Sequence, residues 1–587
     1  MALVVAAVAP FVATLFYGYV YDDSVIILQN PALAGWQSIV EVWKHPYWPA
    51  NLTGSTGLYR PLLMECFAIL LNGAHKYAIA FHAFAIALHV TATLLVAKLL
   101  RRAVGRWPAT AAALWFALHP VHVEAVANIS NTSEVLVCVW TILLALWLLP
   151  ARDKVSAPSI APGWGQAAVA ALLYAAALFT KESGGIAPAL ALLVAVAWRA
   201  PPGPSPREAI AQARGWIRVI PLFVVVVIGV VIVRRLVLGG LTGTSSLAVP
   251  GLAELSAPQR VWAMLSTGGH VARLLLWPTM QTPDYGPTTL PTGIDRSLAA
   301  SATVAVIVLG VAWAMRLALR PDRPDSRPLV GVLWCLIAYF PASNLIGATG
   351  PILAERTLYM TSAGVAMLVG WSLEHLFEQR AARSASLSRI SLPTVAAAAV
   401  IVAACVRGYT QTKEYARVWR DHHALFTRIV AVDSLNYRGY QMLAIEAKDR
   451  RQYDESARLY ARAYVLLPSE PTLLTNYGEY LLEMRRPRYA LAIGERLMTH
   501  PDAWTDARAV TLLLNATARV WGVDSVLASA ERLNARAPSA RSALFIGMAY
   551  DLMGDSSAAR TAYHDGLRIA PADSALLAHT SLRARPP

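Results

Sequence analysis

Charged residues are scarce in this chain: Asp, Glu, Lys and Arg make up 15% of its 587 residues, whereas 56% are hydrophobic. A composition this apolar excludes an ordinary soluble globular protein and indicates membrane-spanning helices. Lys is rare, so the formal net charge of +15 comes from an excess of Arg. Much of that charge lies in short loops between apolar runs, where it indicates membrane topology rather than nucleic-acid binding. We therefore expect no nucleic-acid partner.

Cysteine is also scarce. The four cysteines have no paired spacing, which predicts neither a disulfide framework nor a zinc site. The N-terminus lacks the basic region of a signal peptide, and no convincing cleavage site precedes Asp22. The first apolar run is therefore expected to be retained as a helix.

Long apolar runs dominate the chain up to about residue 408. A run of about 20 apolar residues is long enough to cross a bilayer as a helix. The sequence therefore predicts an all-α protein whose residues 1–408 form a polytopic membrane domain with about eleven transmembrane helices. The runs are 2–20, 77–100, 107–127, 131–149, 165–180, 184–198, 216–238, 297–319, 329–346, 357–377 and 391–407.

Basic loops at alternate turns between these runs set the orientation. The positive-inside rule places such loops, and the N-terminus with them, in the cytoplasm. If a further helical segment, 256–277, also crossed the membrane, the Arg-rich loop at 316–327 would lie outside the cytoplasm. We therefore expect this segment to be interfacial or re-entrant. The loops contain Arg101, Arg102 and Arg106; Arg152 and Lys154; Arg199, Arg207, Arg214 and Arg218; Arg316, Arg320, Arg323 and Arg327; and Arg380, Arg383 and Arg389.

The same alternation places the remaining polar clusters of this half on the extracytoplasmic side. Polar residues scattered without a role would not gather on one face, and ionisable groups near a membrane tend to mark function. We therefore predict a site on this face. Its residues come from Asp22-Asp23, Tyr59-Arg60-Pro61, His119-Pro-Val-His122 with Glu124, Lys181-Glu182-Ser183, Arg234-Arg235, Asp284-Tyr285, Asn344 and Glu355-Arg356.

The last third of the chain carries a repeat. Pro468, Pro501, Pro538 and Pro571 follow one another at spacings of 33, 37 and 33 residues, within a recurring pattern of small and large residues. A period near 34 is typical of helix-turn-helix tetratricopeptide units, which stack into a solenoid that binds peptides or proteins. We predict a connecting helix over 409–435 and a tetratricopeptide-repeat domain over 436–582, with a degenerate unit at 507–538.

The chemistry of the polar face suits a lipid-linked sugar phosphate, because the lipid would stay in the bilayer while the phosphate meets the face. A carboxylate can act as general base towards a hydroxyl, which assigns that catalytic role to Asp22 or Asp23. Guanidinium and ammonium groups bind phosphate and stabilise charge that develops on it. The predicted phosphate-binding residues are Arg60, Lys181, Arg234, Arg235 and Arg356.

Structural roles compete with these functional ones. Arg234 and Arg235 would equally suit side chains that extend to the interface from a helix end. Lys181 and Glu182 would suit an ion pair that closes a helical hairpin.

The remaining polar residues also allow two readings. His119, His122 and Glu124 have partial metal-ligand spacing, but hydrogen bonding that fixes their loop is the simpler interpretation, so we expect no metal and no other cofactor. Glu355 and Arg356 would suit a pair that holds two helices together. The residues predicted to support the site are His119, His122, Glu124, Glu182, Asp284 and Glu355.

The order of these motifs resembles the transmembrane and tetratricopeptide-repeat O-mannosyltransferases. The resemblance covers essentially the whole chain, including the repeats. It rests on Tyr21-Asp-Asp, Asn30-Pro31, Trp36, His45-Pro-Tyr-Trp48, Tyr59-Arg-Pro-Leu62, Phe81-His82, His89, His119-Pro-Val-His-Val-Glu-Ala-Val126, Lys181-Glu-Ser183, Leu274-Leu-Leu-Trp-Pro278, Asp284-Tyr285 and Ala354-Glu-Arg-Thr-Leu-Tyr359.

The resemblance implies a GT-C glycosyltransferase fold, a polyprenyl-phosphate sugar donor and a catalytic Asp in the first extracytoplasmic loop. Asp22 matches the first position of the acidic motif and Asp23 the second. Eukaryotic members transfer mannose to Ser or Thr of proteins, so we expect an inverting transferase whose repeats bind the acceptor protein. The richness in Arg and Ala indicates a GC-rich bacterial genome, so the expected location is a bacterial cytoplasmic membrane. An enzyme of the same fold acting on a lipid or envelope polymer, and a non-enzymatic membrane-anchored scaffold, are the alternatives.

Overall fold

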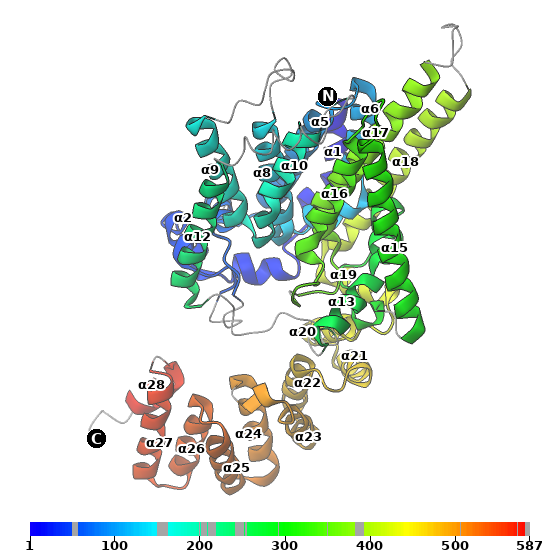
Figure 1. Ribbon diagram of the computed structural model, residues 1–587. Helices are drawn as coiled ribbons and strands as arrows, with labels where there is room; N and C mark the ends of the chain where they lie inside the picture. Colours follow the sequence, from blue (N-terminus) through cyan, green and yellow to red (C-terminus); the bar gives the residue numbers. More distant parts are fainter. Residues whose placement is uncertain are drawn as a thin grey trace. The chain divides into compact units, whose positions relative to one another are not determined.

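The computed structural model describes most of the chain. Its described residues form helices joined by loops, without a β-strand among them, and divide into two compact units, Met1–Ser434 and Leu435–Pro587 (Figure 1). The all-α class predicted from the sequence is confirmed for these residues. They are 1–49, 57–74, 76–149, 163–198, 219–240, 255–290, 293–348, 350–381, 392–504, 506–571 and 573–581, with the single residues 200, 208 and 252.

The first unit contains helices suited to a membrane. Four of its described helices are long and apolar enough to cross a bilayer, which supports a membrane-embedded unit, whereas the predicted count of about eleven crossings is not confirmed. Two of the four bury only 11% of their apolar window, so most of their hydrophobic surface is available to lipid. The four are Ala78–Leu100 (α5), Ile129–Leu148 (which contains α8, Thr132–Leu148), Val219–Leu238 (α12) and Ile294–Ala318 (within α15, Gly293–Ala318).

Shorter helices complete this unit. Several are apolar, and α16 and α17 pack closely because a Cβ on Gly331 would lie 2.8 Å from Leu368 and one on Gly364 would lie 2.7 Å from Cys335. Such small residues let apolar helices approach one another. The helices are α2 (Ser38–Glu41), α4 (Pro61–Gly73), α6 (Arg106–Ala117), α7 (Val123–Ala127), α9 (Trp164–Thr180), α10 (Ala187–Ala197), α16 (Arg327–Tyr339), α17 (Tyr359–Ala381), α18 (Leu392–Ala416) and α19 (His422–Val432).

The first predicted crossing is not one continuous helix. Helix α1 (Ala2–Val8) ends before Pro10, and a short 3-10 helix, η1 (Val12–Phe16), follows. Proline lacks the backbone N–H that a helix interior needs, and its ring clashes with the preceding turn. The apolar pattern alone did not reveal this break.

The segment 256–277 is also divided. It forms α13 (Ala257–Ser266) and α14 (Gly268–Leu276), and a capping box at Ser256 fixes its start. Because a helix rises 1.5 Å per residue, neither half spans a bilayer. At the junction, Gly268 has no room for a Cβ beside Thr303 of α15.

Several helix ends that the sequence assigns to the cytoplasmic side meet in the structure. Arg327 donates to the carbonyl of Ala103 (3.0 Å), and its guanidinium pairs with Glu374. The neighbouring Ser326 hydroxyl donates to the carbonyl of Ala197 (2.6 Å). These contacts join ends that border four of the five predicted basic loops. The loop residues Arg152, Lys154, Arg199, Arg207, Arg214, Arg218, Arg383 and Arg389 lie outside the described residues.

The second unit consists of helix pairs. Each of the four spaced prolines lies between one pair and the next helix, which is the helix-turn-helix arrangement predicted from the period. The pairs are α20 (Tyr437–Asp449) with α21 (Tyr453–Leu466), α22 (Pro471–Glu483) with α23 (Pro487–Leu497), α24 (Ala507–Trp521) with α25 (Val523–Arg536), and α26 (Ala540–Leu552) with α27 (Ser556–Ile569), followed by α28 (Ser574–Ser581).

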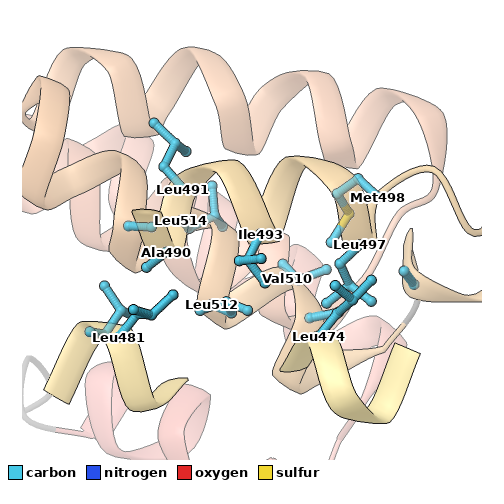
Figure 2. Packing of buried hydrophobic residues seen from close by; sticks show 14 of the residues in the cluster. Leu474, Leu481, Ala490, Leu491, Ile493, Leu497, Met498, Val510, Leu512 and Leu514 are labelled. Carbon is cyan, nitrogen blue, oxygen red and sulfur yellow. The ribbon is translucent and has the colours of Figure 1, made fainter. Parts of the chain in front are cut away.

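Neighbouring pairs are joined by interlocked small and large side chains. Figure 2 shows leucines of α22, α23 and α24 meeting in one cluster, in which Leu474, Leu497 and Leu512 are almost fully buried. Gly478 of α22 has no room for a Cβ because the side chain of Leu512 fills that position. The recurring small residues of the sequence are therefore contact points for the next pair, as a stacked array requires.

Candidate active site

The Tyr21-Asp22-Asp23 loop has an unusual backbone. Tyr21 has a φ of 60°, in the left-handed region, which costs a residue other than Gly about 1–2 kcal/mol and is retained where surrounding contacts impose it. Asp22 is half-buried, whereas Asp23 is 1% exposed. The two neighbouring carboxyl groups therefore have different surroundings.

Asp23 holds the loop in place. Its carboxylate accepts hydrogen bonds from the backbone N–H groups of Ser130 (2.8 Å) and Val20 (3.3 Å). Burial raises the pKa of Asp23 to about 7, even though these donors lower it. Asp22 is therefore the better placed of the two to meet a substrate, and Asp23 the better placed to fix the loop.

Arg60 is the first of four cations near this loop. It precedes α4, and its guanidinium pairs with Glu182 (3.0 Å) while lying 4.7 Å above the ring of Tyr47. Burial acts to lower the pKa of Arg60, but nearby negative charge, Glu182 foremost, outweighs it and the pKa is raised. Arg60 is therefore held in its charged form and in one orientation.

Glu182 joins two of these cations. Besides Arg60, it lies 3.6 Å from Arg234 of α12, whose side chain is 23% exposed and also donates to the carbonyl of Gly57. Burial acts to raise the pKa of Glu182, but Arg60, Arg234 and other donors lower it overall. Arg235, the next residue of α12, is exposed. Its role in phosphate binding stays a prediction.

Lys181 pairs with Glu134 of α8 (2.6 Å), so the alternative in which it pairs with Glu182 is wrong. The turn between α9 and α10 directs the two side chains to different partners, and it is tight because Gly184 has no room for a Cβ beside Ala177. Burial lowers the pKa of Lys181, although Glu134 acts in the opposite direction. Glu134 lies in the first turn of α8, just before the apolar run of that helix, and was not identified from the sequence.

Arg356 is the fourth cation. Its guanidinium and its backbone N–H both bind the carboxylate of Glu124, the latter at 2.9 Å, and its side chain remains 25% exposed. Burial alone would lower the pKa of Arg356, but Glu124 and more distant carboxylates, Asp22 among them, raise it. A guanidinium has five N–H donors, so Glu124 leaves several for a ligand.

These groups lie close enough to influence one another. The charge of Asp22 acts on both Tyr47 and Arg356, and Lys181 is affected by both Arg60 and Arg356. Asp22 lies near Arg356 and near Tyr47, the ring below Arg60, and Glu182 joins Arg60 to Arg234. We call Asp22, Arg60, Lys181, Arg234 and Arg356 the carboxylate–cation cluster.

The histidines predicted to support the site have structural contacts. His119 lies 3.1 Å from the carbonyl of Leu275 and accepts from the backbone N–H of Val121, and His122 contacts the hydroxyl of Ser362 (2.8 Å). Among the described residues, no group of three or more His, Cys, Asp or Glu side chains is arranged to hold a metal ion. That the reaction needs no metal stays a prediction.

Glu355 fixes a neighbouring loop. It is fully buried and accepts hydrogen bonds from the Gln281 side chain (2.7 Å), the Thr282 backbone (3.0 Å) and the Tyr285 hydroxyl (2.7 Å). Burial raises its pKa to about 8. Asp284 belongs to the same loop, where its carbonyl accepts from the Thr282 hydroxyl. Glu355, the residue before Arg356, therefore holds the loop that contains Asp284.

Comparison with known proteins finds relatives that are described as protein O-mannosyl-transferases. The mouse protein O-mannosyl-transferase TMTC3 is 25% identical over 515 residues, which cover 84% of this chain and 53% of that protein. The Drosophila protein O-mannosyl-transferase Tmtc2 is 32% identical over 312 residues, 52% of this chain and 32% of that protein. The resemblance to these transferases is confirmed, and the chain spans about half the length of TMTC3.

Comparisons with family models and with solved structures do not identify a family or a fold. No family model matches the chain. The solved structure of YrrB, a tetratricopeptide-repeat protein with a peptide-binding site, is 17% identical and covers 27% of this chain and 81% of YrrB, with a TM-score of 0.23. A score this low does not support a common fold.

The Glu124–Arg356 pair yields a prediction. Glu124→Gln leaves the guanidinium of Arg356, whose side chain is 25% exposed, without its counter-charge, so we expect the unfolding free energy to fall by about 3 kcal/mol, the lower end for a broken buried pair. Adding Arg356→Gln should remove part of that loss, because the two residues are coupled. Thermal unfolding of purified protein in detergent measures both. Glu41→Gln, which breaks the exposed pair with Lys44, is the control and should not alter the melting temperature. An unchanged melt for Glu124→Gln would contradict the assigned pairing.

Proposed function

We propose that this protein is an integral-membrane glycosyltransferase that moves a hexose, mannose in the simplest case, from a polyprenyl-phosphate donor to Ser or Thr hydroxyls of proteins. The main support is the carboxylate–cation cluster, in which a half-buried carboxylate lies among cations that remain partly exposed. The relatives that are named protein O-mannosyl-transferases also support this function. TMTC3 and Tmtc2 are 25% and 32% identical to the chain, which covers about half of TMTC3.

The donor phosphate would bind the cations of the cluster. Arg356 and Arg234 are the more exposed, and each is already oriented by a carboxylate, Glu124 or Glu182. Preoriented donors stabilise the negative charge that appears on a leaving phosphate without having to rearrange. Arg60 and Lys181 are more enclosed and would add positive potential behind them.

Asp22 would act as the general base. It takes the proton from the acceptor hydroxyl as that oxygen attacks the anomeric carbon of the sugar. The bond between that carbon and the phosphate oxygen breaks with its electron pair going to the lipid phosphate. One displacement from the face opposite the leaving group inverts the anomeric configuration, and neither a metal nor a cofactor takes part.

The membrane placement is part of the proposal. Eleven crossings would put the cluster on the extracytoplasmic side of a bacterial cytoplasmic membrane, where a lipid-linked sugar can reach it. The described ends that border predicted cytoplasmic loops, at Ala103, Ala197, Arg327 and Glu374, meet one another, which fits that assignment. The repeat domain would then be extracytoplasmic as well.

The repeat unit offers a place for the acceptor. A groove of about 690 Å³ lies between α23, α24 and α25. Trp504 and Trp521 line it, and Arg532 and Arg536 follow one face of α25, where Arg536 lies 4.0 Å above the Trp504 ring. Aromatic side chains and paired arginines suit an extended peptide that carries acidic residues.

Replacing the proposed base is the direct mutational test. Asp22→Asn keeps the size of the side chain but cannot accept a proton, so transfer should fall by at least about 100-fold with little change in the amount of folded protein. Asp23→Asn should reduce transfer less than Asp22→Asn. The assay uses purified protein, a polyprenyl-phosphate hexose and a Ser/Thr peptide. Full turnover in both variants would make the mechanism wrong.

The same assay separates the alternatives. Transfer to a lipid or glycan acceptor, with none to peptide, would favour the enzyme that acts on an envelope polymer. Binding of the donor without any transfer or hydrolysis would favour the non-enzymatic scaffold.

The acceptor groove makes a separate prediction. Trp521→Ala and Arg532→Ala should raise the KM for an acidic Ser/Thr peptide while kcat at saturating peptide stays unchanged, because neither residue meets the reacting atoms. Leu552→Ala, at an exposed position on α26, is the matched surface control. An unchanged peptide KM in both groove variants would remove the groove from the acceptor site.

A further inference from the structure

Helix α19 contacts the loop that carries Asp22. The helix begins at His422, where Asp421 caps it by accepting a hydrogen bond from the Ala424 backbone (2.8 Å), and the first unit ends two residues after the helix. The sequence suggested only a connecting helix in this region. In the structure its first residue reaches a site residue about 400 positions earlier in the chain.

The contact is a hydrogen bond to the backbone. The N–H of Tyr21 donates to Nε2 of His422 (3.1 Å), and the Tyr21 ring packs edge-on against Phe426, one turn further along α19 (6.0 Å between centroids). Because Tyr21 has a left-handed backbone, contacts of this kind are needed to hold its conformation. The direction in which the Asp22 side chain extends depends on the backbone conformation of Tyr21.

A second contact links α19 to the opposite side of the cluster. Arg428 donates from Nε to the carbonyl of Gln281 (2.9 Å). The side chain of Gln281 donates to the carboxylate of Glu355 (2.7 Å), and the next residue is Arg356. One helix therefore fixes both the loop with the carboxylate and the loop beside a phosphate-binding cation.

We propose that α19 is a positioning element of the active site, in which His422 sets the direction of Asp22 and Arg428 supports the loop beside Arg356. This inference rests on the proposed transferase function. His422 must present an unprotonated Nε2 to the Tyr21 N–H, so it acts through the backbone and not on the substrate. It is a positioning residue and not a catalytic one.

The test compares two substitutions of His422 with one of its neighbour. His422→Ala removes the acceptor. His422→Gln restores one, because the Gln side-chain oxygen is the same number of bonds from Cβ as Nε2. His423→Ala is the matched control, since His423 is the adjacent histidine in an exposed position.

The positioning role predicts a specific kinetic pattern. Transfer by His422→Ala should show a kcat lower by roughly 10- to 100-fold, as expected for a misplaced catalytic group, with the donor KM unchanged. His422→Gln should recover most of the loss, and His423→Ala should behave as wild type. If His422→Ala keeps the wild-type kcat, or if His422→Gln is as impaired as His422→Ala, the hydrogen bond does not position Asp22 and the inference is wrong.

Hydrogen exchange provides a readout that needs no activity. The Tyr21 amide should exchange faster in full-length His422→Ala than in wild type, return towards the wild-type rate in His422→Gln and remain unchanged in His423→Ala. Equal exchange at Tyr21 in all four proteins would overturn the inference. If the wild-type protein transfers no sugar, the proposed function fails, while Tyr21 exchange still decides whether His422 holds the loop.

Discussion

The first unit depends on the compensation of buried charge. Glu182, Glu134 and Glu124 together hold four cations, and each carboxylate belongs to a different part of the fold. An unpaired charge in such surroundings would cost several kcal/mol, so the pairs fix the positions of the loops that carry them. The same pairs orient the cations before any ligand arrives. Stability and preorganisation for an anion therefore have one physical origin.

Asp22 is placed by contacts to the backbone around it. Asp23 binds the Ser130 N–H on one side, and His422 accepts from the Tyr21 N–H on the other. A carboxylate that serves as a base needs a defined direction and access to the acceptor. In this arrangement the buried neighbour supplies rigidity, and the half-buried Asp22 retains access. Helix α19 extends the same support to the loop beside Arg356.

Local patterns predicted much of this structure. The proline period predicted the helix pairs of the second unit, because each proline ends one repeat. Hydropathy does not predict the break at Pro10, because it measures apolar content and not the loss of a backbone donor. The pattern did not give the partners of the polar residues. Lys181 and Glu182 are adjacent in sequence, but their side chains bind Glu134 and two arginines, respectively. His422 could not be identified from its own segment, since its role depends on a contact with Tyr21 across the fold.

A structure with a polyprenyl-phosphate sugar bound tests the central claim most directly. The account predicts the phosphate in contact with the guanidinium groups of Arg356 and Arg234, and the anomeric carbon on the side from which a hydroxyl bound at Asp22 can attack. A phosphate bound away from these arginines, for instance at the opposite helix ends around Arg327, would contradict the account.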